Sequence, residues 1–303
     1  MKRKTEPSRR IVVAVNPAAA FGKGRTSGHQ VVDMLSRAGH QVVAIEEESY
    51  EDLEESIRAS LTPDSVVVAV GGDGVVHLVA NLVSELNLPI GIIPSGTGND
   101  MARHLKIPLG SIDLAVKNFL DALSRDPRPI DLGVAIDNSG RELLFSCVFS
   151  AGFDALVNER ANRMRFPRGR HRYTLALLVE LAKLRPLEYR LVVDGVEEDG
   201  SFLLVAVANS QSFGGGMKVT PDASLVDGKL DVFTLDPLSR LAFLRIYPRV
   251  FKGLHVTDPR VKIRKAKTVE ISGPAIVAYA DGERIDRLPF SLRILPEGLL
   301  VYA

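Results

Sequence analysis

Four short apolar runs, separated by helical patterns, restrict the fold of this chain more than any other feature. The runs are IVVAVN at 11–16, HQVVAIE at 40–46, SVVVAV at 65–70 and PIGIIP at 89–94. Between them, residues 26–38, 49–61 and 75–86 have helical spacing of apolar positions. Continuous Val and Ile runs that alternate with helices are typical of a parallel sheet covered on both faces. We therefore predict an α/β domain in the first third of the chain.

The pattern changes after SRDPRPID at 124–131. Short strand-like segments joined by Gly, Asp and Asn turns follow, among them ELLFSCVFSAGF, SFLLVAVANS, KLDVFTL and FSLRIL. They predict an antiparallel β-sandwich or barrel, with helical insertions near 154–183 and 238–253. We place the boundary near residue 128, with an α/β nucleotide-binding domain over 1–128 and a β-sandwich domain over 129–303. The last segment is a candidate to return to the first domain.

The composition excludes several classes of protein. A chain of 303 residues, 46% hydrophobic and 25% charged, is ordinary globular material for one or two domains. A net charge of +1 argues against a protein dominated by nucleic-acid binding. No apolar run reaches the roughly 18 to 20 residues that span a bilayer. If the substrate is a lipid, the protein must therefore meet the membrane from outside. The single cysteine, Cys147, lies in an apolar run and fits the core of a cytoplasmic protein.

The stretch VVVAVGGDGVVHLVANLV at 66–83 places Asp73 among three glycines, between a strand and a helix. Glycine-rich turns of this kind let backbone N–H groups approach phosphate, and a helix N-terminus favours negative charge. A carboxylate in the turn opposes phosphate unless a metal ion lies between them. The turn therefore suggests a nucleotide bound with Mg²⁺, with a plain tight turn as the alternative.

A second glycine-rich turn, PSGTGND at 94–100, follows the next strand. Gly96, Thr97 and Gly98 offer phosphate contacts, and Asp100 is a candidate metal ligand or supporting carboxylate. The alternative is a helix N-cap at Asn99 or Asp100, and both roles can coexist. Because ligands bind beyond the carboxyl ends of parallel strands, we expect these two turns and the loop NPAAAFGKG to converge on one crevice.

Taken together and in this order, the motifs resemble those of the diacylglycerol kinase-like lipid kinases, and most closely those of the short bacterial members. The resemblance rests on NP…G after the first strand, GGDG after the third and IPSGTGNDMAR after the fourth. It continues with GGGMKVTPDASLVDGKLDV at 214–232, similar to the family's metal-binding turn, and with YADGE at 279–283, similar to its Asp-Gly-Glu motif. The likeness spans residues 11 to about 300.

The resemblance implies a kinase that uses ATP and Mg²⁺ to phosphorylate a hydroxyl of a diacylglycerol-like lipid. It implies that Glu283 is the base for the lipid hydroxyl, with Asp281 as a rival in the same turn, and that Asp73 serves the Mg²⁺-nucleotide. The residues implied to contact the nucleotide are Asn16, Gly71, Gly72, Asp73, Gly74, Val75, Val76, His77, Thr97 and Asp100.

The resemblance also implies a structural Mg²⁺ in the turn at 224–229. Its ligands would be Asp227 and the backbone carbonyls of Ser224 and Lys229, which are oxygen ligands that suit a hard cation. Without the resemblance, the stretch LVDGKL is typical of an Asp-Gly turn in a β-hairpin.

Several positions depart from the family pattern. Val75, His77 and Leu78 stand where relatives commonly have Thr, Asn and Glu, although sphingosine kinases share the His. Glu47 stands in place of a nucleotide-contacting Thr.

Two alternatives to a lipid kinase stay open: an NAD kinase, which shares GGDG, and a nucleotide- or lipid-binding protein on a degraded kinase scaffold. The acceptor lipid is also open, because acyl chains are sorted by the shape of an apolar pocket.

One arginine-rich stretch has no family motif. RANRMRFPRGRHRY at 160–173 has six arginines and no acidic residue. It is either a solvated loop or a contact with anionic lipid, through its arginines and the neighbouring Met164, Phe166 and Tyr173. We expect a cytoplasmic enzyme, peripheral to the inner face of the membrane, with a homodimer as a candidate assembly.

Overall fold

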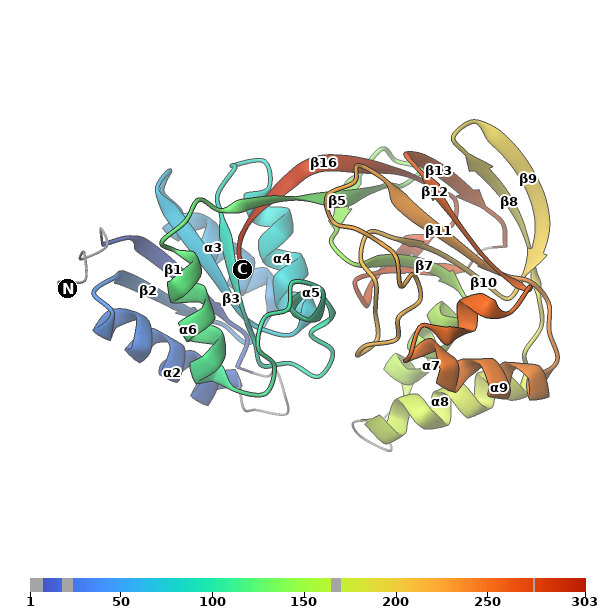
Figure 1. Ribbon diagram of the computed structural model, residues 1–303, viewed down its shortest axis with the longest axis horizontal. Coiled ribbons are helices and arrows are strands. Elements are labelled where there is room, and N and C mark those ends of the chain that lie inside the picture. Colours follow the sequence, from blue (N-terminus) through green and yellow to red (C-terminus); the bar gives the residue numbers. More distant parts are fainter. Residues whose placement is uncertain (1–7, 18–23, 165–169, 275) are drawn as a thin grey trace. The chain divides into compact units, whose positions relative to one another are not determined.

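The computed structural model describes residues 8–17, 24–164, 170–274 and 276–303 (Figure 1). The chain divides into two compact units, Met1–Ile130 with Glu297–Ala303, and Asp131–Pro296. Two strands, β5 (Arg128–Ile136) and β16 (Phe290–Tyr302), contribute residues to both units.

The first unit is built on a parallel sheet in the order β2-β1-β3-β4-β16. Its strands are β1 (Arg10–Val15), β2 (Gln41–Glu46), β3 (Ser65–Gly71), β4 (Ile90–Pro94) and the end of β16. Every residue of β3 and β4 is buried, as continuous Val and Ile runs require. Val301 and Tyr302 of β16 pair in parallel with Ile90 and Gly91.

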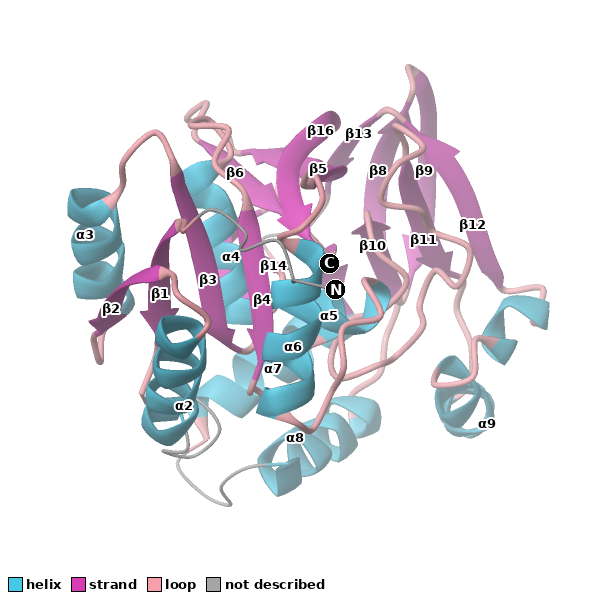
Figure 2. Ribbon diagram, turned by 60° about the vertical axis from the view of Figure 1, so that its left-hand side comes forward, coloured by secondary structure: helices cyan, strands magenta, loops and turns pink. Residues whose placement is uncertain are grey.

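Helices cover both faces of this sheet (Figure 2). They are α2 (Gly24–Arg37), α3 (Tyr50–Ser60), α4 (Asp73–Val83), α5 (Asp100–His104) and α6 (Ile112–Ala122). The helices α2 and α6 pack together on one face, and α3 and α4 pack together on the other. Serine N-caps begin two of them, because Ser49 accepts a hydrogen bond from the N–H of Asp52 and Ser111 accepts one from that of Leu114.

The second unit consists of two antiparallel sheets that enclose one apolar core, which confirms the predicted sandwich rather than a barrel. One sheet has the order β12-β11-β10-β7-β14-β15, and the other joins β9, β8 and β13 to β16, with β5 and β6 beside β16. Phe149 of the first sheet stacks edge-to-face on Phe290 of the second, with ring centroids 5.2 Å apart. The strands are β6 (Glu142–Phe145), β7 (Val148–Gly152), β8 (Leu187–Val193), β9 (Val196–Phe202), β10 (Leu204–Ala208), β11 (Leu230–Leu235), β12 (Val261–Ala266), β13 (Thr268–Ser272), β14 (Val277–Ala280) and β15 (Glu283–Arg287).

The helices of the second unit are α7 (Phe153–Arg163), α8 (Arg170–Ala182), α9 (Arg240–Val250) and the 3-10 helix η1 (Leu254–Thr257). Helix α7 follows β7 directly and packs on β7 and β14, with α8 beside it. Helix α9 is joined to α7 by an edge-to-face contact between Phe243 and Phe153. All three helices therefore belong to the side of the sandwich formed by the sheet that contains β7.

Candidate active site

The two glycine-rich turns of the first unit lie against each other because β3 and β4 are neighbours. Gly71 pairs with Pro94, and the N–H groups of Ser95 and Gly96 both donate to the carbonyl of Gly71. A methyl group added to Gly96 would lie 2.3 Å from the Cα of Gly72, so only glycine permits this approach. The predicted convergence of the GGDG and SGTGND turns is present within this unit.

Asp73 is the first residue of α4 and caps the helix that follows the second turn. Its Oδ1 accepts hydrogen bonds from the N–H groups of Asp100, at 2.7 Å, and Met101, at 3.4 Å, which begin α5. Asn99 closes the same turn, because its side-chain amide accepts from the N–H of Gly96 and donates to the carbonyl of Gly96. One carboxylate oxygen of Asp73, Oδ1, therefore has a structural role as the cap of α5.

The remaining oxygen of Asp73 lies close to a second carboxylate. A methyl group added to Gly98 would lie 2.5 Å from Oδ2 of Asp73 and 3.4 Å from Oδ2 of Asp100. Two carboxylate oxygens thus border the same small space beside a glycine. This donor chemistry fits Mg²⁺, which prefers one or two carboxylates together with phosphate oxygens and water.

The other predicted nucleotide residues are placed in different ways. Thr97 is exposed at the tip of its turn, and His77 is half-buried on α4. The side chains of Val75 and Val76 are buried, and their N–H groups donate to the carbonyl of Gly72 as the first turn of the helix. These two valines therefore belong to the core. Gly71, Gly72 and Gly74 have no side chain, so they can offer a nucleotide only backbone groups.

The first loop contributes one predicted residue, and the helix after it, α2, carries two basic residues that the sequence motifs did not identify. Asn16 is buried just after β1, and residues 18–23 of the NPAAAFGKG loop lie outside the described residues. On α2, Arg25 forms an ion pair with Glu46, and His29 lies 3.4 Å from the same carboxylate. Glu46 ends β2, so this cluster lies at the carboxyl edge of the sheet. Such basic side chains are suited to phosphate, but the local sequence carries no motif that identifies them.

The Asp-Gly-Glu motif forms the turn of the hairpin between β14 and β15. Asp281 and Gly282 occupy the turn with φ values of +52° and +86°, as a two-residue hairpin turn requires. The buried carboxylate of Asp281 accepts hydrogen bonds from the N–H groups of Ser146, Cys147 and Val148 and from the Ser146 hydroxyl. A carboxylate that already accepts four hydrogen bonds is poorly placed to take a proton from a substrate.

Glu283 is the first residue of β15, is half-buried, and pairs with Ala280. Successive side chains of a strand point to opposite faces, so Glu283 and Arg284 face different sides of the hairpin. Arg284 donates to Glu159 of α7, which also accepts from the hydroxyl of Tyr279. Although partial burial opposes it, bonding to Arg163, Tyr279 and Arg284 lowers the pKa of Glu159. This cluster fixes the hairpin on α7.

The predicted metal turn leads into β11 from an irregular loop. Residues 209–229 are all described and contain no strand, so the β-hairpin alternative for LVDGKL is wrong. Asp227 accepts from the Lys229 N–H and from the Lys265 ammonium at 2.6 Å. Asp131, which the sequence analysis did not name, accepts from the N–H of Gly228 at 2.8 Å.

Three carboxylates and one ammonium group surround this turn. The carboxylates of Asp131, Asp227 and Asp231 gather here, and Lys265 lies within 3.3 Å of Asp231. Burial raises the pKa of Asp231, and Lys265 opposes that effect. Among the residues that the structure describes, no group of three or more His, Cys, Asp or Glu side chains has metal-binding geometry, so any cation here would depend on backbone carbonyls.

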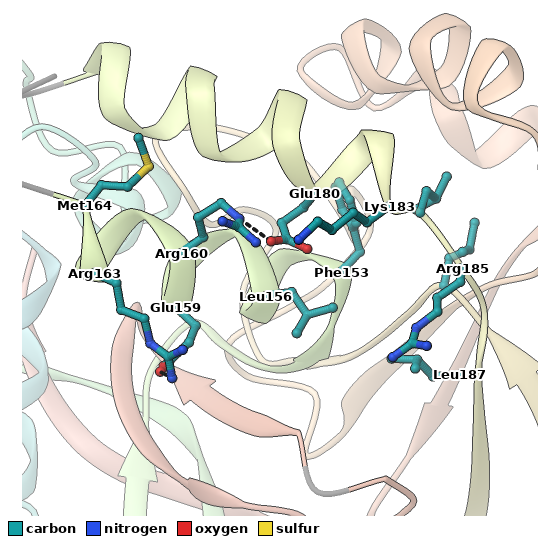
Figure 3. Close-up of a pocket in the computed structure, with 12 residues that line it drawn as sticks. Phe153, Leu156, Glu159, Arg160, Arg163, Met164, Glu180, Lys183, Arg185 and Leu187 are labelled. Carbon is teal, nitrogen blue, oxygen red and sulfur yellow. Dashed lines mark hydrogen bonds and ion pairs between the residues drawn. The ribbon is translucent and has the colours of Figure 1, made fainter. Parts of the chain in front are cut away.

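A cavity of about 730 Å³ lies beside α7 in the second unit (Figure 3). Its apolar lining residues are Phe153, Leu156, Met164, Leu184, Leu187 and Leu203. Basic side chains surround them, and Figure 3 shows Arg160 of α7 joined to Glu180 of α8, with the Arg163–Glu159 pair at one end of the cavity and Arg185 at the other. Two of the six arginines in the arginine-rich stretch are therefore in ion pairs, Arg163 with Glu159 on the same helix and Arg160 with Glu180 of α8. Arg165 and Arg168 lie outside the described residues.

Comparison with known proteins decides the family. Residues 10–135 match the diacylglycerol kinase catalytic domain, and residues 147–303 match the YegS C-terminal NAD kinase beta sandwich-like domain. A diacylglycerol kinase of Mycobacterium tuberculosis (strain CDC 1551 / Oshkosh) is 38% identical, over 96% of this chain and 94% of that protein. This chain belongs to the diacylglycerol kinase family.

Two further proteins are similar over nearly the whole chain, one in sequence and one in fold. A diacylglycerol kinase of Bacillus subtilis (strain 168) is 27% identical over 93% of this chain and 92% of that protein. The crystal structure of a candidate diacylglycerol kinase from Bacillus anthracis has the same fold, with a TM-score of 0.78 at 23% identity over 97% of this chain and 95% of that one.

Membership of the diacylglycerol kinase family confirms the predicted class of enzyme, a lipid kinase, and with it the use of ATP. It also decides against the NAD kinase alternative, because the N-terminal match is to the diacylglycerol kinase catalytic domain. Within the described ranges, no helix combines the length and the apolar character needed to cross a membrane.

Proposed function

We propose that the chain transfers the γ-phosphoryl group of ATP to the free hydroxyl of a diacylglycerol, with Mg²⁺ at Asp73 and Asp100 and with Glu283 as the base. The observation that carries the proposal is the 38% identity to a diacylglycerol kinase over nearly the full length of both proteins. The rest of the proposal assigns roles to this chain's own residues.

The first unit would bind the nucleotide at the paired glycine turns. Close packing of Gly72 on Gly96 leaves two backbone segments without side chains, where phosphate oxygens can approach N–H groups and the N-terminus of α4. Asp73 and Asp100 would hold Mg²⁺ through the oxygens that border Gly98. When bound, the ion neutralises phosphate charge, which is the main need of phosphoryl transfer.

The second unit would supply the base. Two acidic residues lie in the Asp-Gly-Glu turn, and the four hydrogen bonds to Asp281 commit it to holding the turn. That leaves Glu283 as the better candidate to accept the proton of the lipid hydroxyl. Because β14 and β15 are fixed to α7 through Glu159, the position of Glu283 in the second unit is well defined.

The cavity beside α7 supports an acceptor with acyl chains. Its leucine and phenylalanine surface suits hydrocarbon, and its basic rim suits a polar glycerol or phosphate end. We propose that it receives part of the lipid, at the inner face of a membrane. A second cation, held by Asp227 and the carbonyls of Ser224 and Lys229, would stabilise the turn that precedes β11.

A panel of acceptors tests the proposal. The purified chain is incubated with γ-labelled ATP and dispersed diacylglycerol, phosphatidylglycerol, ceramide or sphingosine, and with NAD in solution. We expect label only in phosphatidic acid from diacylglycerol. Label in another lipid or in NADP would overturn the assignment of the acceptor. ATP binding without turnover on any acceptor would indicate a binding protein on a degraded scaffold.

A further inference from the structure

Helix α9 carries apolar side chains on both of its faces, and only one face is packed. Phe243 and Ile246 are buried, and Phe243 stacks on Phe153 of α7 and on Tyr247 of its own helix. The opposite face presents Leu241, Leu244, Pro248 and the following Phe251, spaced at i, i+3, i+7 and i+10. Such spacing forms a continuous stripe along one side of a helix.

This stripe is exposed in the second unit. Leu241 is 70% exposed and Phe251 is 45% exposed, and the exposed apolar surface continues in η1 with Leu254 and Val256. The two elements pack against each other, and α9 lies at the outside of its unit in both views (Figures 1 and 2). Isolated exposed leucines are ordinary, but a contiguous apolar patch on a water-exposed helix usually marks a binding surface.

The charged residues around the stripe indicate which kind of partner this surface would bind. From Arg240 to Thr257 there are four basic residues, Arg240, Arg245, Arg249 and Lys252, and no acidic residue. A two-fold contact with a second copy would bring this basic patch against itself. A basic amphipathic surface with exposed Leu and Phe is instead complementary to a bilayer that contains anionic lipid.

We infer that α9 and η1, over residues 240–257, form a membrane-docking surface whose apolar stripe enters the headgroup region of an anionic bilayer. Leu241, Leu244 and Phe251 insert between lipid headgroups, while Arg245 and Lys252 contact lipid phosphates. The inference goes beyond the proposed reaction, because it assigns a surface for the bilayer itself rather than for the acceptor lipid.

Vesicle binding without ATP tests this inference independently of any kinase activity. The full chain is sedimented with phosphatidylcholine vesicles that contain 30 mol% phosphatidylglycerol or none. We expect binding to the anionic vesicles only, and we expect it to weaken with salt. Arg245→Gln with Lys252→Gln should reduce the partition coefficient about 25-fold, since a basic residue near such a surface contributes about fivefold. Leu241→Gln, Leu244→Gln and Phe251→Gln together should reduce it at least about tenfold.

Matched variants in the first unit serve as controls. Leu86→Gln with Leu114→Gln removes two other exposed leucines, and Lys117→Gln with Arg125→Gln removes two other exposed basic residues. Both controls should bind vesicles as the wild type does, and all variants should retain the wild-type melting temperature. Equal losses in the controls and in the α9 variants would overturn the inference.

A fluorescence probe gives a direct readout, because the chain contains no tryptophan. Leu244→Trp should show a blue shift on anionic vesicles and quenching by brominated acyl chains, whereas Leu114→Trp should show neither. The inference fails if Leu244→Trp stays in a water-like environment on vesicles that bind the protein. It also fails if the triple α9 variant dissociates a wild-type dimer while vesicle binding is unchanged, since the stripe would then be an interface between copies.

Discussion

The carboxylate of Asp281 accepts two hydrogen bonds from Ser146, one from its backbone N–H at 2.7 Å and one from its hydroxyl at 3.0 Å. These bonds join residues that are 135 positions apart and tie the Asp-Gly-Glu turn to the link between β6 and β7. The two acidic residues of that turn should therefore respond differently to substitution.

Glu283→Gln should remove the proton acceptor while keeping the shape of the side chain. General-base assistance is typically worth about 10²–10⁴ in rate, so turnover on diacylglycerol should fall by that order. ATP binding, measured by calorimetry, should be unchanged because the glycine-rich turns proposed to bind ATP belong to the first unit. A variant that keeps its rate, or that loses ATP binding, would show that Glu283 is not the base.

Asp281→Ala should instead lower stability. The substitution leaves the buried N–H groups of Ser146, Cys147 and Val148 without their acceptor, and each such loss costs about 1–3 kcal/mol. We expect the free energy of unfolding, from urea denaturation, to fall by at least about 3 kcal/mol. A stable but inactive Asp281→Ala protein would indicate that this carboxylate acts in the reaction.

Asp73→Asn should abolish productive use of Mg²⁺-ATP and leave the fold intact. The amide oxygen of Asn can still accept from the Asp100 N–H, so the cap on α5 is kept while the charge is lost. Asp73→Ala removes both and should cost about 1 kcal/mol of stability in addition. Turnover of the Asn variant is measured over a range of Mg²⁺ concentrations, and a normal rate at saturating Mg²⁺ would exclude Asp73 from the site.

Chelation should lower the melting temperature of the wild type more than that of Asp227→Ala. With a cation bound, the carboxylates of Asp131, Asp227 and Asp231 are neutralised, and EDTA leaves Lys265 as their nearby counter-charge. The variant has already lost the proposed side-chain ligand, so EDTA should change its melting temperature little. Equal shifts in the two proteins would place any stabilising cation elsewhere.

The burial of the Asp154 carboxylate predicts that the stability of the protein depends on pH. Both carboxylate oxygens are buried in the first turn of α7 without a hydrogen-bond partner of good geometry among the described residues, and burial raises the pKa from 3.8 to about 6. Between pH 3.8 and about 6 the folded protein holds a proton that the unfolded chain has lost. The free energy of unfolding therefore falls as the pH rises through this range, and the contribution of Asp154 is fully lost above about pH 6.

Asp154→Asn should therefore be more stable than the wild type at pH 8, by up to about 3 kcal/mol. The advantage should shrink as pH falls through about 6 and vanish well below pH 3.8, where Asp154 is protonated in both states. Urea denaturation of the two proteins at several pH values measures this difference. A constant difference would mean that Asp154 is ionised in the same way in the folded and unfolded states.

The sequence predicts the parts of this structure that depend on local pattern. Continuous Val and Ile runs identify β1, β3 and β4, and glycines mark the turns where β3 and β4 end. Because the carboxyl ends of parallel strands share one edge, the approach of the two turns follows from the fold class alone.

Contacts between distant residues were not predictable in the same way. The bond from the N–H of Asp100 to Asp73 and the ion pair of Lys265 with Asp227 depend on which strands become neighbours, and no short motif encodes that. The arginine-rich stretch lacks acids in its own sequence, yet the fold brings Glu180 to Arg160. Val75 was predicted to contact the nucleotide only because of its position in the family motif. Its buried side chain reflects the apolar face that α4 needs against the sheet.

The pairing of β16 with β4 has a consequence for the order in which the protein can be made. The first unit buries Leu299, Val301 and Tyr302, and Tyr302 stacks edge-to-face on Phe119. A ribosome adds these residues only after all of Asp131–Pro296 has been synthesised. The first unit therefore cannot complete its sheet while its own N-terminal segment is being translated, and the edge of β4 stays uncovered until the second unit has been synthesised.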